Sequence, residues 1–193
     1  MDRNKRHVDI LLENEIIDLK AYTRGRYFRD YMMICLALGT GLRNSELINL
    51  RVENIRPLDE ISSILDLPAA IAKGNTGRQI PLHPDLRTLL EEFLKWKWDH
   101  GENIDPAALL FLSKFTRHNL SPRDFQRLVR SLSLAAIGRP IHPHVLRHTF
   151  ATRLLTVSNL RVVQKVLGHK NICTTTVYTH PSQDEVFTAI SKM

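Results

Sequence analysis

The side chains best suited to chemistry lie in the segment IHPHVLRHTFATRLL, residues 141–155. Within it His142, His144, Arg147 and His148 fall in seven consecutive positions, so one helix would hold several of them close together. Such residues occur in zinc sites, beside nucleophiles as bases, and in sites that bind phosphate. For this segment alone, a solvated surface of His and Arg side chains is an equally good interpretation.

Several common sites are disfavoured by spacing. His144 and His148 have the four-residue spacing of many zinc ligands, but no Glu follows His144 and no third ligand is evident. The G-x-G of LGTGLRN lacks a third glycine and follows a helical segment, and the chain has neither a P-loop nor a serine nucleophile elbow. Cys35 and Cys173 form no paired metal-ligand motif.

The composition favours a nucleic-acid partner. The chain has 193 residues, 43% of them hydrophobic, which suits one compact domain. Its net charge is +7, its isoelectric point is about 9.7, and arginines outnumber lysines two to one. Arginine binds phosphate oxygens in pairs through its planar guanidinium. No apolar run approaches the length of a membrane span and no signal-peptide core precedes Asp9, so we expect a cytosolic location.

Cleavage of a phosphodiester without a metal needs a defined set of groups. Cations must face the non-bridging oxygens, a nucleophile must be activated, and the leaving oxygen needs a proton. His144 and Arg147 would share a helix face, and His169 directly follows Gly168, which should end the preceding helix. Tyr178 ends a β-branched stretch of weak helix propensity; taken alone, it is better interpreted as a half-buried tyrosine.

The elements that must position these residues are mostly helical. The nearly all-apolar stretch YMMICLAL should be buried, and Ser121 followed by Pro122 predicts the start of a helix. A β region follows the third helix, and we expect its last part to be a hairpin of two short strands. The predicted helices span 13–22, 27–38, 43–50, 84–98, 122–136, 142–155, 159–167 and 171–177, with a last one from Gln183; the β-like pieces are 50–55, 62–67 and 69–82.

Five motifs in order resemble one family. HPHVLRHTFAT, VLGHKN and TTTVYTH resemble the catalytic motifs of the tyrosine recombinases, the phage-integrase family. TGLRNSEL, with Arg43 and Glu46, resembles the family's first arginine motif, and AKGNTGRQIPL resembles the hairpin that carries its lysine, here Lys73. The resemblance extends from Val8 to Tyr178. It implies an α+β, predominantly α-helical fold, the multihelical DNA breaking-rejoining catalytic domain with a small antiparallel sheet.

The resemblance also implies roles for individual residues. Tyr178 would attack a DNA phosphate and leave a 3′-phosphotyrosyl bond and a free 5′-hydroxyl. Arg43 and Arg147 would contact the non-bridging oxygens, and Lys73 would protonate the departing oxygen. His144 would act as general base or acid near the tyrosine, whose pKa of about 10 requires such help at neutral pH.

Four further residues are assigned around these. His169 would donate a hydrogen bond to a phosphate oxygen. Glu46 lies at helical spacing from Arg43 and would hold its guanidinium; a solvent-exposed ion pair of little energetic value is the alternative. His142 and His148 are expected to be structural or peripheral.

The function implied is site-specific recombination of double-stranded DNA by a tetramer of this chain, without ATP, metal or cofactor, in a bacterial or phage-like cytoplasm at the nucleoid. A type IB topoisomerase-like relaxase shares the chemistry and is one alternative. A DNA-binding module that has lost cleavage is another. A metal-dependent nuclease would need clustered carboxylates, which the sequence does not offer.

Residues outside the catalytic set are predicted to contact DNA or protein. The basic residues predicted to contact the DNA backbone are Lys114, Arg117, Arg123, Arg127 and Arg130. The alternative for each of them is an ordinary solvent-exposed position. The tail, residues 181–193, carries apolar residues at helical spacing and would dock on a neighbouring protomer or in cis. Most members carry an N-terminal DNA-binding domain, which is absent from residues 1–193; residues 1–8 are interpreted as a linker remnant, in a fragment or in a minimal member.

Overall fold

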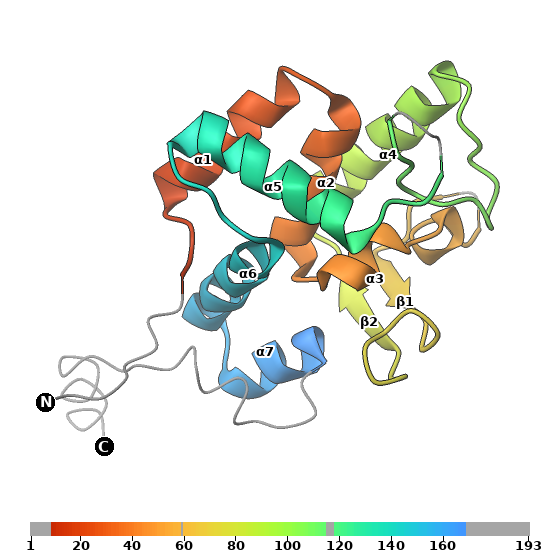
Figure 1. Ribbon diagram of the computed structural model, residues 1–193. Helices are drawn as coiled ribbons and strands as arrows, with labels where there is room; N and C mark the ends of the chain where they lie inside the picture. The colour runs from red at the N-terminus through yellow and green to blue at the C-terminus, as the bar shows by residue number, and fades with distance from the viewer. Residues whose placement is uncertain (1–8, 59, 115–117, 169–193) are drawn as a thin grey trace, which may run out of the picture.

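Helices dominate the computed structural model, which describes residues 9–58, 60–114 and 118–168 (Figure 1). The predicted fold class, predominantly helical α+β with a small antiparallel sheet, is confirmed. No helix in these ranges is long and apolar enough to cross a membrane. The elements are α1 (Glu13–Arg24), α2 (Phe28–Thr40), α3 (Asn44–Ile48), the 3-10 helix η1 (Val52–Asn54), β1 (Ile64–Leu67), β2 (Arg78–Pro81), α4 (Pro84–Asp99), α5 (Pro122–Ile137), α6 (Pro143–Val157) and α7 (Leu160–Leu167).

Helix α2 lies at the centre of the core. Its apolar residues leave no hydrophilic face, and Met32, Ile34 and Leu36 are fully buried, as predicted for this stretch. It packs against α1, α4 and α6, so these four helices share one hydrophobic core. Gly41, in the left-handed conformation at φ 63°, ends α2 and turns the chain toward α3.

The sheet differs from the prediction in two places. Strands β1 and β2 pair with each other in antiparallel register, with Leu65 opposite Ile80. The hairpin predicted within residues 69–82 is therefore wrong, because the chain makes helical turns after Pro68, whose carbonyl accepts the N–H of Ala72 at 3.2 Å. Residues 50–55, predicted as β, contain η1, because the Asn54 side chain accepts a backbone N–H and stabilises a turn.

Helices α5 and α6 begin at their predicted prolines. The Ser121 hydroxyl accepts the N–H of Asp124 at 3.2 Å, and the Asp124 carboxylate accepts the Ser121 N–H at 3.0 Å, which closes a capping box at the start of α5. Phe125 and Val129 turn inward from α5, as its pattern predicts. Pro143 is the first residue of α6.

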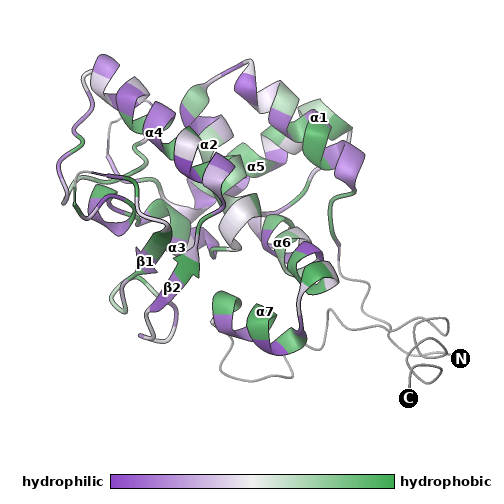
Figure 2. Cartoon of the chain, turned by 180° about the vertical axis from the view of Figure 1, so that it is seen from behind, coloured by the Kyte–Doolittle hydropathy of each residue, from purple (hydrophilic) through white to green (hydrophobic). Residues whose placement is uncertain are grey.

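Helix α7 packs on α6 through a second, smaller apolar cluster of Ala151, Val163 and Leu167. Bands of hydrophobic and hydrophilic residues alternate along both helices (Figure 2). A Cβ atom on Gly41 would lie 2.3 Å from the Phe150 ring and 2.9 Å from Leu167. A glycine at the end of α2 therefore lets α6 and α7 approach the rest of the fold.

Candidate active site

Arg43 is placed by the turn that joins α2 to α3. It precedes the first residue of α3, and its backbone N–H donates to the Glu46 carboxylate at 2.9 Å. Its guanidinium donates to the same carboxylate at 2.7 Å, so backbone and side chain are both fixed by one residue three positions on. The side chain is 16% exposed, which leaves part of the guanidinium open to a ligand.

Glu46 is fully buried and accepts hydrogen bonds from two arginines. Burial alone would raise the pKa of its carboxyl, but hydrogen bonds from Arg78 and Arg43, together with their positive charge, lower that pKa to about 2. The carboxylate is therefore ionised at neutral pH. The alternative of a solvent-exposed ion pair is wrong for Glu46, whereas its predicted contact with the Arg43 guanidinium is present.

Arg78, the second arginine on Glu46, is absent from the sequence-based site. It lies at the start of β2 and donates to both carboxylate oxygens, at 3.1 and 2.8 Å. Its Nε donates to the Val166 carbonyl at 2.8 Å. The signal that could have revealed it is the alternation of β2: Arg78 shares the inward face of the strand with the buried Ile80.

Arg147 reaches the same region from the buried side of α6. Its guanidinium donates to the Gly41 carbonyl at 2.5 Å and to the Leu167 carbonyl at 2.9 Å. The residue is 4% exposed. Because these contacts join the end of α2 to the end of α7, Arg147 also helps to position the two helices.

The C-terminus of α7 meets three arginines. Its last carbonyls and that of Gly168 carry the negative end of the helix dipole, and they accept hydrogen bonds from Arg78, Arg147 and Arg43. The Arg43 contact, to the Gly168 carbonyl, is the longest at 3.4 Å. The end of α7 at Gly168 therefore lies beside the arginine cluster.

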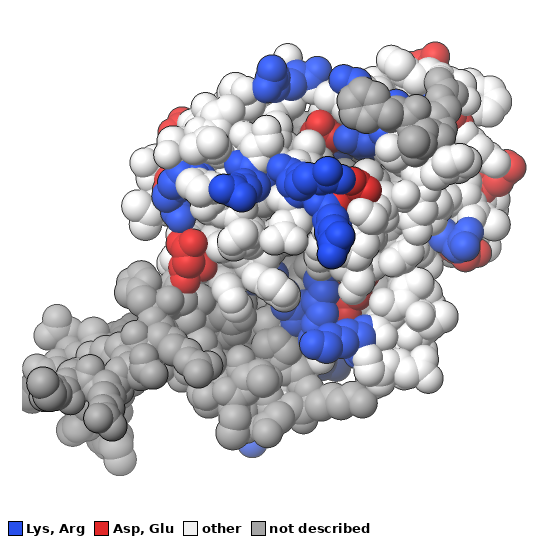
Figure 3. Space-filling model, in the orientation of Figure 1, with Lys and Arg blue, Asp and Glu red and all other residues white. Residues whose placement is uncertain are grey.

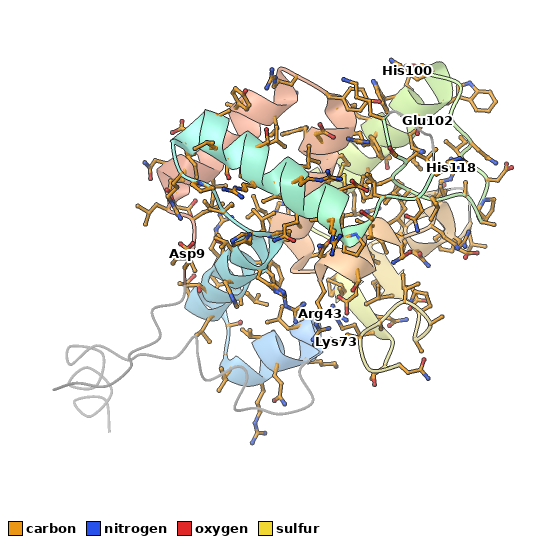
Figure 4. The ribbon with its side chains drawn as sticks, viewed as in Figure 1. Asp9, Arg43, Lys73, His100, Glu102 and His118 are labelled. Carbon is orange, nitrogen blue, oxygen red and sulfur yellow. The ribbon has the colours of Figure 1, made fainter. Side chains whose placement is uncertain are left out.

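Lys73 approaches from the connection between β1 and β2. Its side chain is exposed, and its backbone N–H lies 3.4 Å from the Glu46 carboxylate. Figure 4 shows Lys73 and Arg43 next to each other, near the end of α7. The lysine thus contributes an exposed cation at the edge of the arginine cluster.

His144 lies on the exposed side of α6 within the electrostatic reach of these cations. Burial, followed by the charges of Arg147 and Lys73, lowers the pKa of His144 below its ordinary 6.5. Arg43 acts on it in the same direction. The imidazole is therefore neutral at pH 7 and able to accept a proton. The His148 ring lies 6.3 Å from the His144 ring, and burial lowers the pKa of His148 as well.

The geometry brings together four of the six predicted catalytic residues, Arg43, Lys73, His144 and Arg147. Arg43 and Arg78 bind the one buried carboxylate of Glu46. Arg147 and Lys73 add two further cations nearby, so the site carries excess positive charge. Such a cluster is suited to an oxyanion such as phosphate. His169 and Tyr178 lie outside the described residues, as do the predicted helix 171–177, the tail 181–193 and the N-terminal residues 1–8.

A second basic region lies on the same face of the molecule. Figure 3 shows a row of Lys and Arg side chains across α5 and a further group over the region of Arg43 and Lys73. The exposed arginines of α5 are Arg123, Arg127 and Arg130. Arg127 is engaged by Asp124 at 2.5 Å, and the Lys114 ammonium lies 5.0 Å from the Tyr27 ring. Arg117 lies outside the described residues.

Metal ligands do not cluster in the part of the chain that the structure describes: no group of three or more His, Cys, Asp or Glu side chains there could hold a metal ion. His142 and His148 flank His144 on or next to α6. The His142 ring nitrogen lies 3.4 Å from the Gln126 amide nitrogen, on the exposed side of α5.

Comparison of the whole sequence with known proteins identifies a family and several relatives. The chain matches the Phage integrase family over residues 9–185. A tyrosine recombinase of Pseudothermotoga lettingae is 39% identical over 191 residues, which make up 98% of this chain and 62% of that protein. Tyrosine recombinase XerC of Azotobacter vinelandii is 38% identical over 154 residues, 79% of this chain and 48% of that protein. This chain therefore spans less than two thirds of either relative.

Solved structures agree on the fold. The crystal structure of XerA recombinase matches 100% of this chain and 66% of that chain with a TM-score of 0.77 and 26% identity. XerH site-specific recombinase, in a pre-cleavage complex with its difH substrate, matches 99% of this chain and 56% of that chain with a TM-score of 0.76 and 22% identity. At that identity, the second likeness concerns the fold alone.

Proposed function

Because the chain belongs to the phage integrase family, we propose that it cleaves and rejoins DNA strands in site-specific recombination. Tyr178 attacks the phosphate, forming a 3′-phosphotyrosyl bond and breaking the bond to the 5′-oxygen. Arg43 and Arg147 bind the non-bridging oxygens, and Lys73 gives its proton to the leaving oxygen. His144 accepts the proton of the tyrosine.

One observation carries this proposal. Cations from the α2–α3 turn, the β1–β2 connection and α6 meet at the end of α7, and burial together with the charge of the same cations lowers the pKa of His144. A phosphodiester transition state gathers negative charge on its non-bridging oxygens, and preorganised cations stabilise that charge. A metal ion is not needed for this task when arginines perform it.

The proton transfers fit the types of the residues. A neutral imidazole can take the phenolic proton, whereas the ordinary pKa of a tyrosine, about 10, leaves it protonated at neutral pH. Lysine can release a proton and arginine cannot, so Lys73 rather than Arg43 is suited to the acid role. His169 would bind a phosphate oxygen, since it follows the α7 terminus that contacts the arginine cluster.

Double-stranded DNA is the proposed partner, and a tetramer on DNA is the proposed assembly. Two of the related structures hold DNA: XerH with difH, and the Tn1549 transposon integrase with circular intermediate DNA. The exposed arginines of α5 lie on the same face as the active site and would contact the DNA backbone. The bond energy is retained in the phosphotyrosine, so rejoining to a second 5′-hydroxyl requires no ATP.

Covalent trapping tests the proposal. A nicked duplex lets the cleaved strand diffuse away, so the protein remains attached to the DNA and migrates as an adduct on denaturing gels. Pooled random duplexes and the sequences that flank the source gene serve as substrates, in buffer with EDTA. Tyr178→Phe removes the nucleophile. Tyr22→Phe is the matched control, because Tyr22 lies in α1, away from the active site, and its hydroxyl accepts a hydrogen bond only from Arg26 in the turn after that helix among the contacts described.

We expect adducts with the wild type and with Tyr22→Phe, and none with Tyr178→Phe. An adduct that persists in Tyr178→Phe contradicts the assignment of the nucleophile. If no variant forms an adduct but duplex DNA still binds, the chain is a binding module. Relaxation of supercoiled DNA without strand exchange would favour the topoisomerase-like alternative.

A further inference from the structure

We propose that Arg78 is a positioning residue of the active site, acting on the phosphate through Glu46, Arg43 and the end of α7. This inference rests on the proposed DNA cleavage and deepens it. Arg78 lies between β2 and two parts of the site that are far apart in the sequence, α3 and α7.

All three nitrogens of the Arg78 guanidinium bind protein acceptors. Nη1 and Nη2 donate to the two oxygens of Glu46 at 3.1 and 2.8 Å, and Nε donates to the Val166 carbonyl at 2.8 Å. Its side chain is 8% exposed, half the value for Arg43. Arg78 is therefore committed to the protein and is not free to bind a phosphate directly, in contrast to Arg43.

The second arginine on Glu46 offsets the negative charge of the carboxylate. Glu46 holds the Arg43 guanidinium at 2.7 Å, but a buried negative charge next to a phosphate site would also oppose the binding of a phosphate. Arg78 offsets that charge with its own, so Glu46 can orient Arg43 without making the site less positive. Because Arg78 donates to both oxygens, it also fixes the plane of the carboxylate that Arg43 meets.

The contact with α7 extends this positioning to the next segment. Gly168 has φ 65°, and a Cβ atom there would lie 3.0 Å from Cδ of Arg78 and 3.3 Å from its Nη1. The guanidinium thus packs directly against the last residue before His169. A displacement of Arg78 would move both the carboxylate that holds Arg43 and the end of α7.

The test uses the full chain with Arg78→Lys, which keeps the charge but loses the planar fork, and Arg78→Gln as a second variant. Arg139→Lys is the matched control: Arg139 also contacts a glutamate through two nitrogens, at 2.6 and 2.9 Å, at the packing of α1 against the α5–α6 connection. Circular dichroism verifies that each variant is folded.

The first readout needs no DNA. Arg43→Lys assigns the guanidinium signals of Arg43 in ¹⁵N NMR spectra, and exchange measurements give the rotation rate of its guanidinium. We expect Arg78→Lys and Arg78→Gln to raise that rate about tenfold and Arg139→Lys to leave it unchanged. Equal rates in the wild type and both Arg78 variants would overturn the proposal, whatever happens on DNA.

The second readout is the rate of adduct formation on the nicked duplexes. Because the protein is trapped after one cleavage, the rate constant at saturating DNA and the half-saturating DNA concentration are measured. We expect Arg78→Lys to lower that rate constant about 10- to 100-fold with little change in the half-saturating concentration, because a misplaced phosphate ligand slows the chemical step. Adding Glu46→Gln should lower the rate constant no further, since both changes break one chain of contacts. Independent, multiplying losses would mean that Arg78 acts on DNA directly and would refute positioning through Glu46.

The two readouts separate this inference from the function on which it rests. A wild type that forms no adduct contradicts the proposed cleavage, and the NMR rates still decide whether Arg78 fixes Arg43. A wild type that forms adducts with the same single-turnover rate constant as Arg78→Lys supports cleavage and overturns the positioning role.

Discussion

Replacing Glu46 with glutamine should destabilise the fold by an amount that depends strongly on pH. The substitution keeps the size of the side chain but removes the negative charge that two guanidinium groups share, at 2.7 and 2.8 Å. Glu46 is fully buried, so solvent does not screen this loss. Removal of one partner from a buried ion pair is costly because it leaves the other charge without compensation.

The shifted pKa of Glu46 sets the magnitude. In the folded protein the pKa is about 2, against 4.5 for a free glutamate. At 1.36 kcal/mol per pKa unit, the ionised carboxylate contributes about 3 kcal/mol to the free energy of unfolding. The folded pKa is the lower one, so this contribution is complete above pH 4.5 and is lost progressively as the pH falls toward 2.

Urea unfolding at a series of pH values from 7 down to about 3 measures this contribution. The difference in free energy of unfolding between wild type and Glu46→Gln should be about 3 kcal/mol at pH 7 and should shrink steadily below pH 4.5. Glu15→Gln is the matched control. Glu15 also contacts an arginine, Arg139, but its side chain is 15% exposed, so we expect a smaller difference.

A difference between wild type and Glu46→Gln that stays constant from pH 7 to about pH 3 would refute this reasoning, because below pH 4.5 the unfolded chain binds a proton at Glu46 and the stabilisation by the ionised carboxylate should decline. A loss at pH 7 no larger than that of Glu15→Gln would also contradict it. Either result would mean that the two arginines do not hold the carboxylate in its ionised form.

Three further predictions concern the frame of the site and its electrostatics. Gly41→Ala should cost about 2 kcal/mol or more in urea unfolding, whereas Gly101→Ala, also at positive φ but with nothing within 4 Å, should cost only the backbone term of about 1 kcal/mol. The pKa of His144, followed by NMR, should lie below 6.5 and rise in Lys73→Gln; an unchanged pKa would mean that the lysine is remote. Arg127→Gln should reduce the salt dependence of DNA binding by about one in the log–log slope, as expected for the loss of one phosphate contact.

Local sequence signals predicted most of the helices because each signal acts over a few residues. Ser121 and Pro122 specify the start of α5, and Asn159 and Gly168 delimit α7, through caps that the chain makes with its own neighbours. The family resemblance, read from five separated motifs, is confirmed by the match over residues 9–185. The catalytic roles assigned to Arg43, Lys73, His144, Arg147, His169 and Tyr178 all stay predictions; the structure places the first four of these residues, and the last two lie outside the described residues.

Where sequence reasoning failed, contacts between distant residues decided the outcome. The sequence predicts that the segment with Lys73 forms the first strand of a hairpin with the residues that become β2. In the structure β2 pairs with β1 instead, because Ile80 and Leu65 are buried together in the core. The sequence alone leaves open a solvent-exposed ion pair between Glu46 and Arg43. Only the approach of β2 buries it and brings a second arginine to it, 32 positions away along the chain.

The sequence by itself determined most of the described helices, the basic character and the residues that we propose to carry the chemistry, since residue type and short spacing are local properties. The tertiary structure decided how their charges combine. Packing of α7 against α6 and β2 puts its terminal carbonyls onto Arg147 and Arg78, and burial of Glu46 lowers its pKa to about 2. Desolvation and close approach of charges arise only when segments far apart in the chain exclude water together.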